Sequence, residues 1–193
     1  MITKNYNNPF EVKIVETHEE REKVFKLRYE IFVGEIGYAP NYANHTQKII
    51  QEPLDNSAKI FAGFYNGQVI ATSRINLSRN SDLGYYPQIY KMQEFAGDAY
   101  PQYTSISNYF LIKKEFRGSR IILELIQLIY KKLLSENVKF DFLDCEQYMV
   151  PLYTKLGYQN MGEMYHPEFG KGYLMMLDIF KNAISNPTWQ LFS

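Results

Sequence analysis

Apolar and polar positions along this chain alternate with two periods, which divide the chain into strands and helices. Alternation with period two predicts strands, because successive strand side chains point to opposite faces. An apolar position every three or four residues predicts an amphipathic helix. The predicted strands cover residues 10–16, 59–65, 68–77, 103–113, 140–145, 158–165 and 172–180. The predicted helices cover residues 90–95, 119–135 and 149–156, and one more helix begins after Thr17.

Local sequence signals set several element boundaries. Thr17 and Glu20 match a capping box, which places a helix start at Thr17. Asn66-Gly67 separates two strand-like runs and predicts a hairpin with a type I′ turn. Residues 38–50 are polar and irregular, which indicates a loop or short-helix region. No repeat or linker divides the chain, so one domain over residues 1–193 is expected, with a core at about 10–180.

Composition excludes several classes of function. The 21 basic and 21 acidic residues give a net charge of zero, so no global field favours nucleic acid. No apolar run is long enough to span a membrane, and the N-terminus has no apolar signal core, so a cytoplasmic location is expected. One cysteine and three scattered histidines predict neither a disulfide nor a metal site. The tail 181–193 is apolar after Pro187 and is expected to dock on the body or on a partner.

The segment from residue 105 to residue 121 has the pattern of a phosphate site. A strand over 105–112 leads through a charged turn over 113–120 into an apolar helix. Unpaired N–H groups and the dipole at a helix N-terminus favour an anion. Gly118 allows close approach of the backbone, while Arg117 and Arg120 add donors and positive charge. The pattern predicts a phosphate-bearing ligand.

Two segments, in this order of elements, resemble the GNAT N-acyltransferase superfamily. Leu111–Arg120 (LIKKEFRGSR) is similar to its pantetheine and pyrophosphate loop, and Leu152–Tyr158 (LYTKLGY) to its Tyr-x-x-x-Gly-aromatic segment. The resemblance covers roughly residues 10–180. It implies an α/β (α+β) three-layer fold with a mixed sheet of about seven strands, helices on both faces and a splayed strand pair. Arg120 replaces the usual small residue, and a cation there suits a single phosphate, as on a carrier protein's phosphopantetheine arm.

Three further segments resemble one branch, the acyl-homoserine-lactone synthases and the long-chain N-acyl amino acid synthases. They are Lys26–Phe32 (KLRYEIF), Glu52–Asp55 (EPLD) and Thr72–Leu77 (TSRINL). Autoinducer synthases carry Glu-x-Ser-Arg on the central strand, where this chain has Ser105–Asn108 (SISN). The N-acyl amino acid synthases, or a relative acylating another amine, are therefore the better match.

The resemblance implies that an acyl-CoA or acyl-carrier-protein thioester is the co-substrate, with no metal. The implied donor-binding residues are Leu111, Ile112, Arg117, Gly118, Ser119, Arg120 and Ile121. The acyl and pantetheine chain would lie between the strands 105–112 and 140–145. Tyr153 would be the general acid for the leaving thiolate; the alternative is a core tyrosine packed under its helix. Lys113, Lys114 and Arg117 would receive an acidic carrier protein or would form an ordinary solvated turn.

The implied acceptor site combines acids, arginines and strand polar groups. Glu52, with Asp55, would bind the acceptor's ammonium group or take its proton, unless the two belong to a solvated acidic loop. Arg28 and Arg74 would pair with these acids or with an acceptor carboxylate; a purely structural ion pair is the rival. The polar strand residues that would hydrogen-bond the acceptor, or have no role, are Ser105, Ser107 and Asn108.

Cys145 has acidic neighbours and no evident histidine partner, so a small buried hydrophobe is favoured over a nucleophile. The sequence therefore predicts an N-acyltransferase in which the amine attacks directly. The acyl group, expected to be fatty, would pass to a primary amine of an amino acid or of a peptide Lys or ornithine side chain. Two alternatives remain open: a small-acyl N-acetyltransferase that uses acetyl-CoA, and a non-catalytic protein that binds acyl thioesters.

Overall fold

The computed structural model describes residues 9–185, and the side chains of residues 9–182. Contacts divide the chain into two compact units, each assembled from separate segments. The first unit contains Met1–Glu52, Lys59–Arg74 and Tyr109–Ile129, and the second contains Pro53–Ala58, Ile75–Asn108 and Tyr130–Ser193. The apolar tail after Pro187 lies outside the described residues. Within residues 9–185, no helix has both the length and the apolar character that crossing a membrane requires.

Seven strands pair into one mixed sheet in the order β1-β4-β5-β6-β7-β9-β8. They are β1 (Phe10–Val15), β4 (Lys59–Tyr65), β5 (Gln68–Leu77), β6 (Thr104–Ile112), β7 (Phe140–Cys145), β8 (Gln159–His166) and β9 (Gly170–Asp178). Each strand falls where the period-two pattern predicted one. The mixed α/β architecture expected from the sequence is confirmed.

In the first unit, β1 pairs antiparallel with β4, from Phe10 opposite Tyr65 to Val15 opposite Ile60. The chain then turns into β5 through Asn66 and Gly67, whose φ values are 49° and 78°. A type I′ turn needs positive φ at both central residues, and an Asn-Gly pair adopts it at low cost. The predicted hairpin is confirmed.

Helix α1 (His18–Tyr29) begins at the predicted capping box. The Glu20 amide donates to Thr17 Oγ1 at 3.2 Å, and the Glu20 carboxylate accepts from the Thr17 amide at 3.5 Å. The helix continues without interruption as the π-helix η1 (Glu30–Ile36) and ends at Gly37, whose φ is 77°. Such π turns are rare and occur frequently at functional sites.

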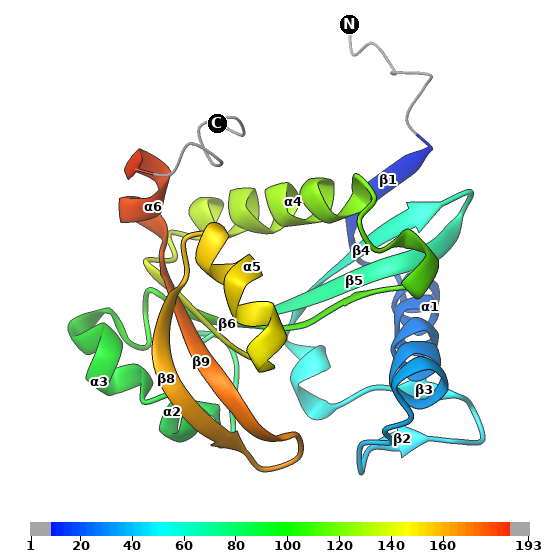
Figure 1. Ribbon diagram of the computed structural model, residues 1–193, viewed down its shortest axis with the longest axis horizontal. Helices are drawn as coiled ribbons and strands as arrows, with labels where there is room; N and C mark the ends of the chain where they lie inside the picture. Colours follow the sequence, from blue (N-terminus) through cyan, green and yellow to red (C-terminus); the bar gives the residue numbers. More distant parts are fainter. Residues whose placement is uncertain (1–8, 186–193) are drawn as a thin grey trace, which may run out of the picture. The chain divides into compact units, whose positions relative to one another are not determined.

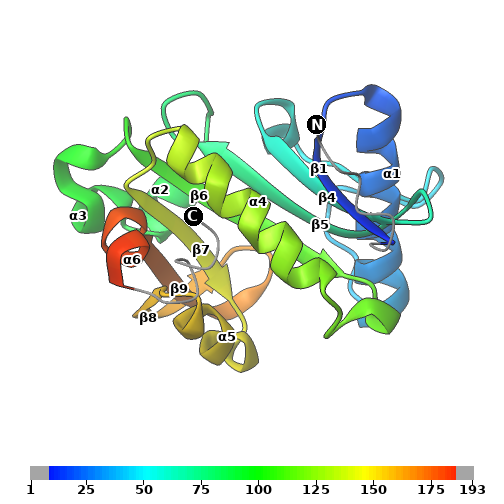
Figure 2. The ribbon, with the colours of Figure 1, turned by 90° about the horizontal axis from the view of Figure 1, so that it is seen from above.

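The first unit has helices on both faces of its strands. Figure 2 shows β1 and β4 between α1 and the first half of α4 (Ile121–Ser135). Ile121 packs on β4 at Gly63, where a Cβ would lie 2.8 Å from the isoleucine side chain. The missing side chain at Gly63 thus lets the start of α4 approach the strand closely.

The region expected to be a loop or a short helix contains a small hairpin instead. Residues Ala43–Asn44 (β2) pair antiparallel with Ile49–Ile50 (β3). Two residues per strand are too few for an alternation pattern, so the sequence could not predict this pairing.

In the second unit, β6 and β7 pair in parallel from Thr104 opposite Phe140 to Ile106 opposite Phe142. Among the described residues of this unit the ladder ends there, although β7 continues to Cys145. This short ladder is the splayed pair that the resemblance implied. β9 pairs antiparallel with both β7 and β8, and α5 (Val150–Lys155) lies beside the β8–β9 hairpin (Figure 1).

The remaining short helices complete the two units. They are η2 (Pro53–Asn56), α2 (Tyr86–Ile89), α3 (Met92–Ala96), η3 (Gly97–Ala99), η4 (Lys114–Phe116), η5 (Gln147–Met149) and α6 (Ile179–Ser185). The last strand was predicted to continue to Phe180, which is wrong, because residues from Ile179 onward are helical. The carboxylate of Asp178 accepts from the Lys181 amide at 3.0 Å and so caps the helix that replaces the strand end.

Candidate functional site

Arg28 lies on the buried face of α1. Its guanidinium carbon lies 4.1 Å from the ring centroid of Tyr109 and 5.2 Å from that of Phe25. The guanidinium of Arg74, on β5, lies 4.8 Å from the same Tyr109 ring. Two buried cations therefore share one aromatic ring, an arrangement that stabilises them electrostatically.

Glu52 forms a short ion pair with Arg74, whose side chain is fully buried while that of Glu52 is 10% exposed. The Tyr109 hydroxyl is 2.7 Å from that of Tyr42. Burial raises the pKa of Tyr109, and the charge of Glu52 adds to the rise while the Arg28 guanidinium opposes it. We call Arg28, Arg74, Glu52 and Tyr109 the guanidinium cluster.

Tyr109 has a backbone φ of 56° in the middle of β6, which is uncommon for a residue other than glycine. A left-handed residue in a strand acts as a bulge and re-aims its side chain. Here that conformation accompanies a ring contacted by both arginines. Such strain is stored most often at functional sites.

The loop before α4 has the backbone geometry of a type II turn. Arg117 has φ −64° and ψ 132°, Gly118 has φ 85°, and the Ser119 amide donates to the Phe116 carbonyl at 3.1 Å. The amides of Gly118, Arg120 and Ile121 donate no backbone hydrogen bond to a described residue. These donors precede a helix of 15 residues, so the predicted anion-binding geometry is present.

The charged side chains of this loop are largely engaged by acids of the same unit. Lys113 pairs with Glu30 at 2.7 Å and Arg117 with Glu35 at 2.5 Å. Arg120 pairs with Glu124 at 2.9 Å and is 71% exposed, so its side chain leans along α4. The Arg117 Nε also donates to the Ile112 carbonyl at 3.0 Å. The backbone donors, more than the side chains, are thus available to an anion.

In the second unit, Asp141 is fully buried among hydroxyl groups. Ser105 Oγ donates to its Oδ1 at 2.5 Å, and the Tyr158 hydroxyl donates to its Oδ2 at 2.7 Å. Burial raises the pKa of Asp141 to about 6, and the hydrogen bonds from Ser105 and Tyr158 oppose the rise. We call Asp141, Ser105 and Tyr158 the Asp141 network. It accounts for one serine that the sequence assigned to the acceptor, whereas the buried Ser107 Oγ makes no hydrogen bond to a described residue.

Tyr153, on α5, packs its ring at 5.4 Å and nearly edge-on against Tyr158. The Tyr153 hydroxyl makes no hydrogen bond to a described residue, and burial followed by the neighbouring Cys145 raises its pKa. The α5 helix ends at Gly157, whose φ is 87° and where a Cβ would lie 2.1 Å from Asn182. A phenol that keeps its proton, with its hydroxyl uncommitted, has the properties of a general acid.

Cys145 is buried, and burial with the charges of Asp144 and Glu146 raises the pKa of its thiol to about 12. A thiol that stays protonated is a weak nucleophile. The surroundings of Cys145 therefore favour a packing role over a role as nucleophile, as the sequence predicted.

A second carboxylate of β7 lies beside α2. The hydroxyl of the fully buried Tyr90 donates a short hydrogen bond to Asp144 Oδ1, and Asn108 Nδ2 lies 3.5 Å from the same hydroxyl. Asp144 is half-buried, and its Oδ2 makes no hydrogen bond to a described residue. Residue spacing gave no reason to pair Tyr90 with Asp144. The only signal was a second acidic residue, beside Asp141, in a strand that is otherwise apolar.

The two acids that were predicted to act together, Glu52 and Asp55, belong to different compact units. Asp55 is fully buried in η2. This short helix is held by Asn76 of β5, whose Nδ2 donates to the Leu54 carbonyl at 2.8 Å and to Ser57 Oγ at 3.2 Å. Within residues 9–185, no group of three His, Cys, Asp or Glu side chains is arranged to hold a metal ion.

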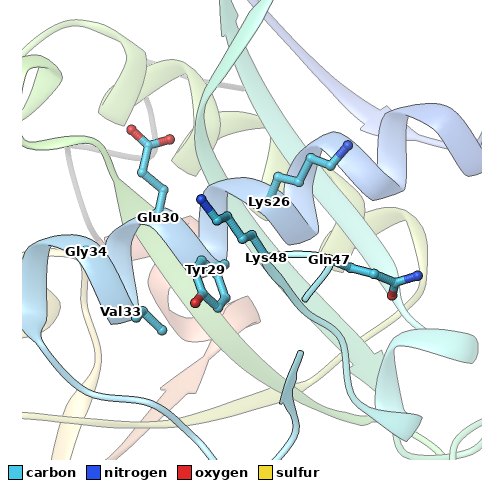
Figure 3. A pocket seen from close by; sticks show the side chains of 7 residues that line it. All are labelled: Lys26, Tyr29, Glu30, Val33, Gly34, Gln47 and Lys48. Atoms are coloured by element: carbon cyan, nitrogen blue, oxygen red, sulfur yellow. The ribbon is translucent and has the colours of Figure 1, made fainter. Parts of the chain in front are cut away.

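A shallow cavity of about 460 Å³ lies on the outer side of α1 and η1 (Figure 3). Tyr29, Glu30, Gln47 and Lys48 are among its lining residues, and none of the predicted site residues lines it. The Tyr29 hydroxyl is committed to His45 Nδ1 at 2.8 Å, and Glu30 is committed to Lys113. We assign this cavity no part in the chemistry.

The strand order, the short β6–β7 ladder and the amide-lined turn before α4 define the fold of the GNAT-type acyltransferases. The chain resembles the branch of that fold that contains N-acyl amino acid synthases and acyl-homoserine-lactone synthases. FeeM, an N-acyl amino acid synthase from uncultured soil microbes, superposes with a TM-score of 0.73 at 14% identity, over 94% of this chain and 96% of FeeM.

Two other solved structures share the fold. The CoA-dependent acyl-homoserine lactone synthase BjaI has a TM-score of 0.67 at 12% identity, over 91% of this chain and 81% of BjaI. A putative N-acetyltransferase from Lactobacillus plantarum has a TM-score of 0.65 at 12% identity, over 89% of this chain and 99% of that protein. No protein-family profile and no curated protein sequence matches the chain.

Proposed function

We propose that this protein is an N-acyltransferase that moves an acyl group from a phosphopantetheine thioester to a primary amine by direct attack. The observation that carries the proposal is the turn before α4, where three uncommitted backbone amides meet the N-terminus of a long helix. Backbone donors at a helix N-terminus bind phosphate. Because the chain shares its fold with acyltransferases, we identify this phosphate as the one on the pantetheine arm of CoA or of a carrier protein.

Donor binding uses the strand end, the turn and the first helical residues. Gly118, Arg120 and Ile121 contribute the amides, and Ser119 adds a buried hydroxyl that makes no hydrogen bond to a described residue. The backbone groups of Leu111 and Ile112 align the pantetheine amides, and Arg117 supports them through its bond to the Ile112 carbonyl. Lys114, which forms no ion pair among the described residues, is the loop cation best placed to receive an acidic carrier protein.

Acceptor binding falls to the charged and polar groups of the sheet. Glu52, fixed by its pair with Arg74, attracts the acceptor's ammonium group. Arg28 and Arg74 recognise an acceptor carboxylate, which makes an amino acid the favoured acceptor class. Asn108 hydrogen-bonds the acceptor, whereas Ser105 acts indirectly through Asp141.

The reaction requires proton loss from the acceptor nitrogen and proton donation to the leaving sulfur. The acceptor ammonium loses a proton, its nitrogen attacks the thioester carbon, and a C–N bond forms as the C–S bond breaks. Tyr153 donates its proton to the leaving sulfur and recovers one from the former ammonium nitrogen. The products are an amide, a free thiol and one proton released to water.

We propose a fatty acyl donor, an acceptor that is an amino acid or a peptide Lys or ornithine side chain, and a cytoplasmic enzyme that acts as a single domain. The likeness to FeeM, an N-acyl amino acid synthase, supports the amino acid as the acceptor. A small-acyl acetyl-CoA-dependent N-acetyltransferase is the second candidate, favoured by the likeness to the Lactobacillus plantarum protein.

The test is an acylation assay with acetyl-CoA and decanoyl-CoA against the twenty proteinogenic amino acids, read by mass spectrometry. Wild-type protein is expected to form N-decanoyl products. Tyr153→Phe is expected to lower kcat about 10²- to 10⁴-fold while the donor's Kd changes little. Tyr148→Phe, at an exposed tyrosine on η5, is the matched control and should keep full activity. Binding of acyl-CoA without any turnover by the wild type would instead identify a non-catalytic thioester-binding protein.

A further inference from the structure

Asp144 and the Tyr153 acid lie on opposite faces of β7. Successive side chains of a strand alternate between faces, so Asp141 and Cys145 share one face while Phe142 and Asp144 share the other. Tyr153 belongs to the first face, because its ring packs against Tyr158, which hydrogen-bonds Asp141. The second face carries the buried cluster that contains Phe142 and Tyr90.

Asp144 stands just beyond the point where the β6–β7 ladder ends. The last parallel pair joins Ile106 to Phe142, and Asp144 and Asn108 each lie two residues further along the same face. In the proposed acyltransferase, the thioester lies in the gap that opens where the ladder stops, so a carboxylate at this position borders that gap.

We propose that Asp144 is the general base, which takes the proton from the acceptor's ammonium group, with Tyr90 and Asn108 holding its carboxylate in place. This inference rests on the proposed N-acyltransferase function and adds to it the catalytic group on the acceptor face. The proton moves from the ammonium nitrogen to Asp144 Oδ2, directly or through one water, and returns to solvent after the amide forms. No further reactant is required.

Two other carboxylates, the fully buried Asp141 and the half-buried Glu52, are less suited to this task. Asp141 accepts a hydrogen bond on each oxygen and is fully buried on the Tyr153 face. Glu52 is held in its ion pair with Arg74, where an arginine stabilises the charged form and weakens it as a base. Asp144 alone combines partial exposure, one oxygen fixed by Tyr90 and a second oxygen that makes no hydrogen bond to a described residue.

The experiment compares two acceptors of nearly equal shape at pH 7 with decanoyl-CoA as donor. One is the amino acid that the wild type acylates best, whose amine is protonated. The other is the matching α-aminooxy acid, whose nitrogen is already neutral and needs no base. Asp144→Asn is expected to lower kcat for the amino acid about 10²- to 10⁴-fold and to leave kcat for the aminooxy acid within a few-fold.

Two variants control the result. Asp144→Asn keeps an oxygen for the Tyr90 hydrogen bond, and an unchanged thermal unfolding midpoint checks that the fold is intact. Glu146→Gln removes an exposed carboxylate two positions away and should leave both rates unchanged. Equal losses with both acceptors, or no loss with the amino acid, overturn the role of Asp144 as base. No acylation by the wild type overturns the proposed function itself, a separate outcome.

Discussion

Each of the two compact units buries charged side chains, and the two units stabilise these charges in different ways. The guanidinium cluster of the first unit places two cations against an aromatic ring and pairs one of them with Glu52. The Asp141 network of the second unit surrounds a lone carboxylate with hydroxyl donors. The first keeps its charges permanently, because arginine does not lose its proton in proteins. The second contains a group that changes charge in mildly acidic solution.

This difference sets what each region can do. Fixed charges suit the recognition of an acceptor that is itself always charged. A hydroxyl-lined carboxylate instead holds Tyr158 against Tyr153, so it orders the proposed acid. The contrast therefore separates the proposed binding role of the first unit from the proposed positioning role of the Asp141 network.

Breaking the ion pair of the first unit should have the largest effect on stability. Glu52→Ala leaves the guanidinium of Arg74 buried without this carboxylate, which should lower the free energy of unfolding by about 3–5 kcal/mol. Urea unfolding measures the change. Glu11→Ala, at an exposed glutamate of the same unit, should change it by less than about 0.5 kcal/mol. A loss that persists in full after Arg74→Met is added would contradict the pairing as the cause.

In the second unit, Asp141 should make the free energy of unfolding depend on pH. The pKa of Asp141 rises from 3.8 to about 6 on folding, so the folded protein holds a proton that the unfolded chain has lost. Stability is therefore lost as pH rises from about 4 to about 6, by about 3 kcal/mol at about 1.4 kcal/mol per unit. Unfolding at a series of pH values should show this decline in the wild type relative to Asp141→Asn. Parallel curves for the two proteins would remove the distinction between the regions.

An ion-paired acid of the first unit should respond with the opposite sign. The hydrogen bond from Lys13 lowers the pKa of Glu20 from 4.5 to about 2, so its contribution is lost as pH falls from about 5 to about 2. Glu20→Gln should therefore leave the decline between pH 5 and about 6 unchanged. It serves as the control for the Asp141 variant in the same titration.

The smallest effect concerns the ring that both arginines share. Tyr109→Phe removes only the hydroxyl contact with Tyr42 and should cost about 1 kcal/mol. Tyr109→Leu also removes both cation–ring contacts and should cost about 1–2 kcal/mol more. Chemical denaturation of the two variants measures the difference. Equal losses would mean that the ring faces contribute nothing to holding the arginines.

Sequence periodicity predicted the strands, the long helix α4 and the Asn66-Gly67 turn, because these depend on interactions between near neighbours. The capping box at Thr17 was predicted for the same reason. The two-residue hairpin at Ala43 and the helix that replaces the end of the last strand were missed. Elements this short carry too few residues for a period to be recognised.

The sequence by itself determined the order of elements and the amide-lined turn, since a strand, a glycine and a helix start are local features. Only the tertiary structure decided which charged side chains meet. It placed Arg28 and Arg74 on the ring of Tyr109, and gave Ser105 to Asp141. It also brought Tyr90 to Asp144 across 54 residues. Such contacts depend on which strands and helices pack together and in which register, and residue spacing within one element does not identify its partner.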